Sequence, residues 1–189
     1  MYNILYISGS KKKNGNSERL IRFMINELEK FETNTKWLKV SDLSLQGCLG
    51  CDYCTNNAGI CSIKDDMHEI YDAYEWCDAI IISTPVYTRN ASSHVFAIMD
   101  RSYAMKDKHL LEGKLGAAIA VGKGAGQAIA IKSIYSWYLS SGALCVPGEL
   151  NGITATHFEP DDKMAIEKYS KQSKKLAENI IKYLKMIRQ

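Results

Sequence analysis

Ala79-Ile80-Ile81-Ile82-Ser83 decides the fold, because it is an uninterrupted apolar run of strand length. Such a run, without alternation of apolar and polar side chains, is typical of a strand that is buried on both faces of a parallel sheet. Other short segments rich in apolar side chains predict four more strands, at Asn3–Ser8, Thr35–Val40, Leu115–Val121 and Leu144–Pro147.

Amphipathic helices are predicted between these strands. In the first of them, Leu20, Phe23, Met24 and Leu28 recur at the three- and four-residue spacing of one helix face. The predicted helices are Ser17–Phe31, Asp65–Trp76, Ser92–Tyr103, Gln127–Leu139 and Pro160–Ile187. This alternation predicts an α/β fold, with a doubly wound, five-stranded parallel sheet between two layers of helices. No linker or repeat divides the sequence, so we expect one domain over residues 1–189.

The composition excludes several classes of protein. Of the 189 residues 46% are apolar and 24% are charged, which is typical of a globular chain rather than a disordered or coiled-coil one. The formal net charge is only +3, so electrostatics give no support for nucleic-acid binding. The apolar runs are too short to span a membrane, and no basic leader precedes the first of them. We therefore expect a soluble, cytoplasmic protein that binds neither nucleic acid nor membrane.

The loop after the first predicted strand suits an anion. Ligands of such sheets bind at the carboxyl ends of the strands, and here Ser8-Gly9-Ser10 leads to Asn14-Gly15-Asn16-Ser17 and a helix. The N-terminus of a helix presents free N–H groups to a phosphate, and Ser10, Asn16 and Ser17 add side-chain donors. The loop is neither a Walker A nor a GxGxxG sequence, so a small dianion such as a mononucleotide phosphate is expected. The alternative is a polar loop in which Asn16 or Ser17 only caps the helix.

Two further loops at the same edge of the sheet are unusual. The loop after the third strand, Ser83–Asn90, joins hydroxyls and amides to one aromatic side chain, Tyr87. The loop after the fourth strand, Gly122–Gln127, carries three glycines in five residues, so its backbone can approach a flat ring closely. Together the three loops predict a site for a flat, phosphorylated cofactor.

Four cysteines crowd into one short segment after the second strand: Cys48, Cys51, Cys54 and Cys61. Their spacing is C-x2-C-x2-C-x6-C, and the first three resemble the run that wraps an iron–sulfur cubane in bacterial ferredoxins. Zinc is the competing metal, although zinc sites usually pair two C-x2-C knuckles across a longer gap. The remaining alternatives are that these cysteines take part in thiol–disulfide chemistry or that they bind no ligand. Cys77 and Cys145 stand alone in apolar surroundings and are expected to be small buried hydrophobes.

Three pieces of the sequence together resemble a known family. They are Gly9-Ser10 with Asn14-Gly15-Asn16-Ser17, the cysteine run leading into Lys64-Asp65-Asp66-Met67, and Thr84-Pro85-Val86-Tyr87. In this order they resemble the iron–sulfur flavoproteins, in the NADPH-dependent FMN reductase branch of the flavodoxin-like proteins. The similarity extends from the first strand to the glycine loop near Gly126.

The resemblance implies a flavodoxin-like fold that holds FMN, with a [4Fe–4S] cluster bound by the four cysteines of the loop 47–64. The residues that it implies for the FMN phosphate are Ser10, Asn16 and Ser17, with Lys12 or Asn14 nearby. Those that it implies for the flavin ring are Pro85, Val86, Tyr87 and Thr88 on one side, and Gly124 and Gly126 on the other. It also implies a homodimer or homotetramer. Arg89-Asn90 departs from the family, in which small or aromatic residues more often follow the Pro-Val-Tyr step.

Three hypotheses of function follow. The favoured one is an oxidoreductase that passes electrons between a two-electron donor and one-electron partners through FMN and a [4Fe–4S] cluster, with NAD(P)H or a ferredoxin-type protein as its redox partner. The first alternative is an NAD(P)H-dependent FMN or quinone reductase without a cluster. The second is a non-catalytic flavin and metal carrier or sensor. No catalytic acid or base is predicted, because the four histidines are scattered and are expected to be surface residues.

Overall fold

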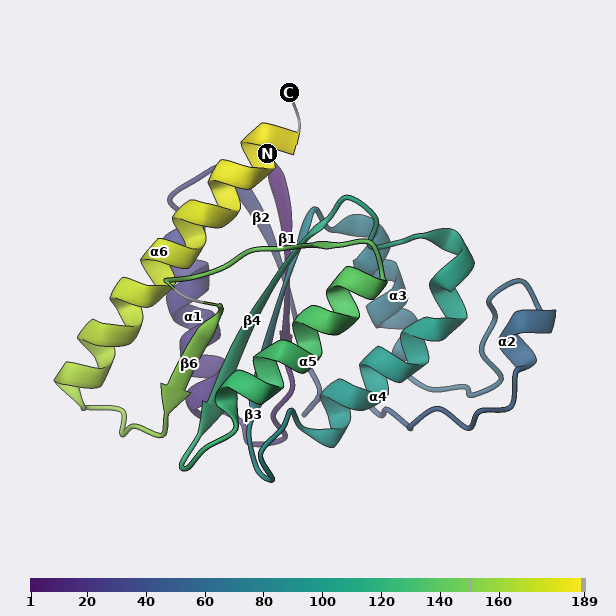
Figure 1. Cartoon of the computed structure of the whole chain (residues 1–189), viewed down its shortest axis with the longest axis horizontal. Helices are drawn as coiled ribbons and strands as arrows, with labels where there is room; N and C mark the ends of the chain where they lie inside the picture. The colour runs from purple at the N-terminus through teal and green to yellow at the C-terminus, as the bar shows by residue number, and fades with distance from the viewer. Residues whose placement is uncertain (150, 188–189) are drawn as a thin grey trace.

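The apolar runs form the middle layer of the structure, a computed structural model that describes residues 1–149 and 151–187 (Figure 1). The strand order is β2 (Thr33–Lys39), β1 (Tyr2–Ser8), β3 (Ala79–Pro85), β4 (Leu115–Gly122), and every pair is parallel. β3 and β4 are buried along their whole length, as strands covered on both faces must be. The predicted parallel α/β fold is confirmed.

Two short strands share the far edge of the sheet. β5 (Leu144–Cys145) pairs with the beginning of β4, and β6 (Ile153–Thr156) pairs with its end. The sequence predicts a single strand at this edge, Leu144–Pro147, and does not predict β6. In β6 buried and exposed residues alternate, as is usual at an edge.

Helices cover both faces of the sheet. α1 (Asn16–Leu28) and α6 (Lys163–Ile187) pack on one face, and α3 (Met67–Trp76), α4 (Ser93–Arg101) and α5 (Gln127–Ser140) pack on the other (Figure 1). The five predicted helices are present, with ends that differ by up to three residues. α4 ends earlier than predicted, because the chain tightens there into a 3-10 helix, η1 (Ser102–Lys108).

Gly116 on β4 makes room for the ring of Tyr138 on α5. A Cβ at Gly116 would come within 2.6 Å of the Tyr138 ring. The Tyr138 hydroxyl donates to the carbonyls of Ile80 and Ala117, at 3.2 and 3.3 Å. The buried hydroxyl is therefore satisfied, and the ring fills the space that the glycine leaves.

The segment between β2 and α3 carries the four clustered cysteines and the short helix α2 (Tyr53–Asn56). In Figure 1 it projects beyond α3 and α4, away from the sheet. Within residues 1–149 and 151–187, none of the helices has the length and apolar character to cross a membrane. Of the predicted domain 1–189, Leu150, Arg188 and Gln189 lie outside the described residues.

Candidate functional site

A hollow of about 460 Å³ opens at the carboxyl edge of the sheet. β1 and β3 end side by side, with Ser8 opposite Ser83, and β4 follows β3. The loops after these three strands therefore meet. The residues that line the hollow are Ser10, Lys12, Gly15, Asn16, Ser17, Pro85, Val86, Tyr87, Val121, Gly122, Lys123 and His157.

The loop between β1 and α1 is tied to the sheet by its backbone. The Gly9 N–H donates to the Ser83 carbonyl at 2.7 Å, and the Ser92 hydroxyl donates to the Gly9 carbonyl at 2.7 Å. The Ser83 hydroxyl donates to the Ser17 carbonyl at 3.0 Å, which fixes the first turn of α1 against β3. The loop is thus held in place by bonds to buried strand ends.

The N-terminus of α1 points its backbone donors toward the hollow. Gly15 is the N-cap, and no side chain caps the helix there. The buried Glu18 carboxylate instead accepts the N–H of Asn14 at 3.1 Å, which holds Asn14 in its left-handed conformation. Uncapped first-turn N–H groups and the helix dipole both favour an anion. Sequence reasoning overlooked Glu18; its signal was an acid in the first turn of the helix.

Two of the lysines near the sheet edge contribute positive charge to the hollow. Lys11 donates to the Leu43 carbonyl at 3.2 Å and Lys13 pairs with Asp42 at 2.7 Å, so both are turned away. Lys12 and Lys123 line the hollow, and neither forms an ion pair with any residue in the described parts of the chain. The local charge therefore suits an anionic ligand.

Val86 and Gly122 lie close together in the lining of the hollow. A Cβ added at Gly122 would lie 3.1 Å from the Cβ of Val86, and the Val86 N–H donates to the Val121 carbonyl at 2.6 Å. The glycine therefore makes room for Val86, which packs directly against the end of β4. The Tyr87 ring is 72% exposed at the rim.

Seven of the eleven residues predicted to bind FMN line this hollow, and four do not: Asn14, Thr88, Gly124 and Gly126. Gly126 has a structural role, because its φ is +116° and a Cβ there would meet the backbone of Arg89. The Asn16 amide lines the hollow, yet it donates to the Phe158 carbonyl at 2.7 Å. Its side chain is therefore already engaged in joining α1 to the segment after β6.

The main residue that sequence reasoning missed is His157. It follows β6, and its N–H donates to the Gly122 carbonyl at 3.2 Å, which brings its side chain to the hollow. Its Nε2 lies 3.2 Å from a carboxylate oxygen of Glu159. Since β6 was not predicted, nothing in the sequence pattern placed a histidine here. The other lining residues that were not predicted to bind FMN lie in the predicted loops or end a predicted strand: Gly15, Val121, Gly122 and Lys123.

The cysteine loop forms a second region, supported by tight turns. The backbone is left-handed at Gly50, Asp52, Ala58 and Gly59. Cys48 and Cys51 are exposed, Cys54 and Cys61 are half-buried, and all four are free thiols. No group of three or more potential ligands within residues 1–149 and 151–187 is gathered closely enough to hold a metal ion. The four-cysteine ligand set therefore stays a prediction.

Polar contacts to two of the sulfurs are already in place. The Gly50 N–H donates to the Cys48 sulfur at 3.4 Å, and the Cys51 sulfur lies 3.3 Å from the Ser62 hydroxyl. The bond to Ser62 lowers the pKa of the Cys51 thiol. Burial, in contrast, raises the pKa of Cys77 to about 12. Thiolate is the form that binds metal, so Cys51 suits a thiolate-ligated centre better than Cys77 does.

The two ends of the cysteine loop are joined to each other. Ser44 and Asp66 exchange two hydrogen bonds, from the Ser44 N–H to the Asp66 carboxylate at 2.7 Å and from the Asp66 N–H to the Ser44 carbonyl at 3.1 Å. The Asp65 carboxylate accepts the N–H of Gln46 at 2.9 Å. The loop thus leaves and re-enters the fold at one place.

A buried ion pair secures this closure to α4. Arg101 donates to both carboxylate oxygens of Asp65, at 2.9 and 3.0 Å, and to the Gln46 carbonyl at 3.0 Å. Both side chains of the pair are 2% exposed. Burial opposes the ionisation of Asp65, but the bonds from Arg101, Gln46 and Met67 hold its pKa below the usual range. This pair, 36 residues apart in sequence, was not foreseen.

Comparison with known proteins places the chain among flavoproteins. Residues 2–157 match the profile of the NADPH-dependent FMN reductases. An iron–sulfur flavoprotein of Archaeoglobus fulgidus is 32% identical over 97% of this chain and 96% of its own length. Two further iron–sulfur flavoproteins are similar. That of Methanosarcina thermophila is 34% identical over 91% of this chain and 92% of its own length. That of Methanocaldococcus jannaschii is 35% identical over 75% of this chain and 73% of its own length.

Solved structures share the fold at low sequence identity. RosB, with a bound riboflavin-5'-phosphate intermediate, superposes with a TM-score of 0.80 at 16% identity, over 100% of this chain and 81% of RosB. A flavodoxin, WrbA-like protein from Agrobacterium tumefaciens superposes with a TM-score of 0.67 at 14% identity, over 97% of this chain and 99% of that protein. The flavodoxin-like fold is thereby confirmed.

Proposed function

The chain belongs to the iron–sulfur flavoproteins of the NADPH-dependent FMN reductase family, and from this premise we propose that it passes electrons between a two-electron donor and one-electron partners through FMN and a [4Fe–4S] cluster. Membership makes it a flavin oxidoreductase. The observation that carries the finer proposal is the pairing of an anion-binding hollow at the sheet edge with four thiols on one closed loop.

The hollow fits FMN at both ends. The uncapped N-terminus of α1, the hydroxyls of Ser10 and Ser17 and the Lys12 ammonium would hold the phosphate. Val86 and Gly122, which line the hollow, would contact the ring. Bound there, FMN would supply a hydride acceptor that can release its electrons singly. The protein's part is to position the ring and to exclude water from one of its faces.

The cysteine loop fits an iron–sulfur cluster better than zinc. It offers four thiols within a short stretch of sequence, a backbone that turns through left-handed positions, and one backbone N–H already directed at a sulfur. Hydrogen bonds to ligand sulfurs are usual at iron–sulfur centres. We propose Cys48, Cys51, Cys54 and Cys61 as the ligands, and NAD(P)H or a ferredoxin-type protein as the redox partner. We further propose a homodimer or homotetramer.

One observation favours a second candidate, an NAD(P)H-dependent FMN or quinone reductase without a cluster. In the described residues the loop thiols are not gathered into a ligand group, whereas the hollow at the sheet edge is fully formed. In that case the flavin site alone would carry the activity.

Anaerobic purification separates the two candidates. We expect about one FMN, and about four iron and four acid-labile sulfide, per chain, with a broad visible absorption that dithionite bleaches. Cys54→Ala should lose the iron and keep the FMN, while Cys145→Ala, which changes a thiol outside the loop, should keep both. FMN without iron in the unaltered protein would favour the second candidate. A colourless protein, with neither iron nor FMN, would contradict both.

A further inference from the structure

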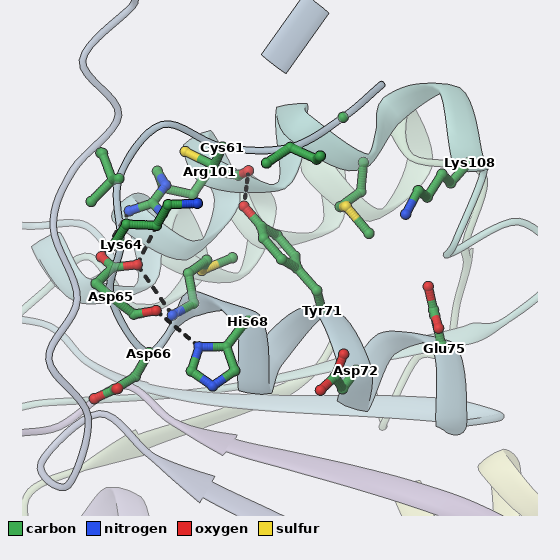
Figure 2. A pocket seen from close by; sticks show the side chains of 15 residues that line it. Cys61, Lys64, Asp65, Asp66, His68, Tyr71, Asp72, Glu75, Arg101 and Lys108 are labelled. Atoms are coloured by element: carbon green, nitrogen blue, oxygen red, sulfur yellow. Dashed lines mark hydrogen bonds and ion pairs between the residues drawn. The ribbon is translucent and has the colours of Figure 1, made fainter. Parts of the chain in front are cut away.

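Arg101 is the most buried cation beside the cysteine loop. It reaches from α4 into a hollow of about 600 Å³ that lies between the loop, α3 and η1, and that is lined by Cys61, Asp65, Tyr71 and Lys108 among others. Figure 2 shows the guanidinium between the Asp65 carboxylate and the side chain of Cys61. The backbone carbonyl of Arg101 accepts a hydrogen bond from the Tyr71 hydroxyl at 2.8 Å, so the end of α4 is held in place as well.

One donor of this guanidinium has no acceptor. Nη1 and Nη2 are bonded to Asp65, and Nη1 also to the Gln46 carbonyl. Nε, in contrast, is buried without a hydrogen-bond partner anywhere in residues 1–149 and 151–187. Nearly all buried donors in folded proteins are paired, so an exception needs an explanation. Here the two terminal nitrogens hold the guanidinium in place and leave Nε–H facing elsewhere.

The sulfur of Cys61 can accept such a bond. Cys61 is half-buried and lines the same hollow as Arg101. A protonated thiol is a weak acceptor, whereas a ligand thiolate is a strong one. A cluster bound through Cys61 would therefore give the unpaired donor of Arg101 an acceptor.

We propose that Arg101 donates its Nε–H to the sulfur of Cys61 when that sulfur ligates the cluster, and thereby raises the reduction potential of the cluster. The inference rests on the proposed function, because it needs a cluster on the loop. A hydrogen bond and a buried positive charge both favour the reduced cluster, which carries one more negative charge. Lys64 and Lys108 line the same hollow but are exposed, so water screens their charges.

Pulsed EPR detects the bond directly. Protein grown with arginine labelled with ¹⁵N at Nε is reduced with dithionite, and the hyperfine spectrum of the reduced cluster is recorded. We expect a ¹⁵N coupling in the unaltered protein and its loss in Arg101→Lys, which keeps a positive charge but has no Nε–H. Iron-replete protein without this coupling would overturn the inference and leave the proposed function standing.

The reduction potential gives a second, independent readout. We expect Arg101→Lys to lower the equilibrium constant for cluster reduction about tenfold, equivalent to about 59 mV for one electron. Lys108→Met is the matched control, since it removes an exposed cation from the same hollow, and it should change that constant less than about twofold. Equal effects of the two substitutions would overturn the inference.

The FMN and iron content of each variant shows whether a missing ¹⁵N coupling reflects a missing hydrogen bond or a missing cluster. FMN and iron are measured in every variant, so an Arg101→Lys protein that retains FMN but no iron is recognised as defective in cluster assembly. In that case Asp65→Asn, which leaves Arg101 in place, is labelled and examined for the same ¹⁵N coupling. Absence of iron from the unaltered protein would contradict the proposed function, and the inference with it.

Discussion

The hollow at the sheet edge and the cysteine loop differ in what holds them in shape. Around the hollow, bonds between strand ends such as Gly9 to Ser83 and Val86 to Val121 fix the backbone. The cysteine loop is secured where it leaves and re-enters the fold, at Ser44–Gln46 and Asp65–Asp66, while Cys48 and Cys51 stay exposed. A ligand site on the sheet is preorganised by the core. A site on the loop needs its ligand to complete it.

Thiol reactivity gives the sharpest test of this difference. In protein freed of iron by a chelator, we expect iodoacetamide to modify Cys51 at least about a thousandfold faster than Cys77 at pH 8, because the thiolate is the reactive form and the two pKa values lie on opposite sides of the ordinary one. The Cys51 rate should reach half of its maximum at a lower pH than an ordinary thiol does, because its pKa is lowered, while the Cys77 rate should still be rising near pH 11.

Mass spectrometry of the alkylated peptides measures both rates in one sample. Protein that retains its iron is the control, and in it Cys51 should be protected. Comparable rates for the two thiols in iron-free protein would show that the loop is as closely packed as the core.

Breaking the attachment of the loop should cost more stability than any change within it. Asp65→Ala leaves Arg101 buried and unpaired, and we expect the free energy of unfolding to fall by about 3–5 kcal/mol. The double variant Asp65→Ala, Arg101→Met should recover part of this loss, because no unpaired charge remains. Urea unfolding of FMN-free protein measures both. A loss below about 1 kcal/mol for the single variant would show that the pair does not secure the loop.

The glycine loop at the hollow offers a matched pair of substitutions. Gly126→Ala places a Cβ against the Arg89 backbone at a φ of +116°, so we expect a loss of about 1–3 kcal/mol. Gly124→Ala has no atom within 4 Å of the new Cβ, and the stability of the FMN-free protein should change by less than about 0.5 kcal/mol. Thermal melting compares the two. Equal losses would mean that the loop is not fixed by contact with Arg89.

The smallest expected effect is on FMN affinity. Lys12→Ala removes an ammonium that lines the hollow, and we expect FMN to dissociate about fivefold more readily, equivalent to about 1 kcal/mol. Lys13→Ala is the matched control, since Lys13 pairs with Asp42 away from the hollow. Fluorescence titration at two salt concentrations measures both. A larger effect of Lys13→Ala would place the phosphate elsewhere.

The sequence was informative where burial is uniform or regularly periodic. The run Ala79–Ser83 identifies a strand because it is buried along its whole length, and Leu20, Met24 and Leu28 identify a helix because they are buried at helical spacing. β6 was missed, because the sequence pattern of a four-residue edge strand with every second residue exposed cannot be distinguished from that of a loop. The place of His157 at the hollow was missed as a consequence.

Contacts between distant segments were beyond sequence reasoning. Asp65 was identified by its place beside the cysteines, but Arg101 lies on another helix, and nothing local marks it as the partner. Gly126 was predicted to lie beside the flavin ring, and the structure adds that a Cβ there would meet the backbone of Arg89. In both cases the pattern identified an unusual residue, and only tertiary packing supplied the reason for it.

The hydrogen bonds between Ser44 and Asp66 make the intervening segment a modular insert. Because its ends meet, residues can be added or removed between them without shifting any strand, as the low entropic cost of lengthening a closed loop allows. Evolution could thus equip an older flavin scaffold with a cysteine segment, or delete it again, in one genetic step. The same property makes the segment suitable for grafting onto other scaffolds.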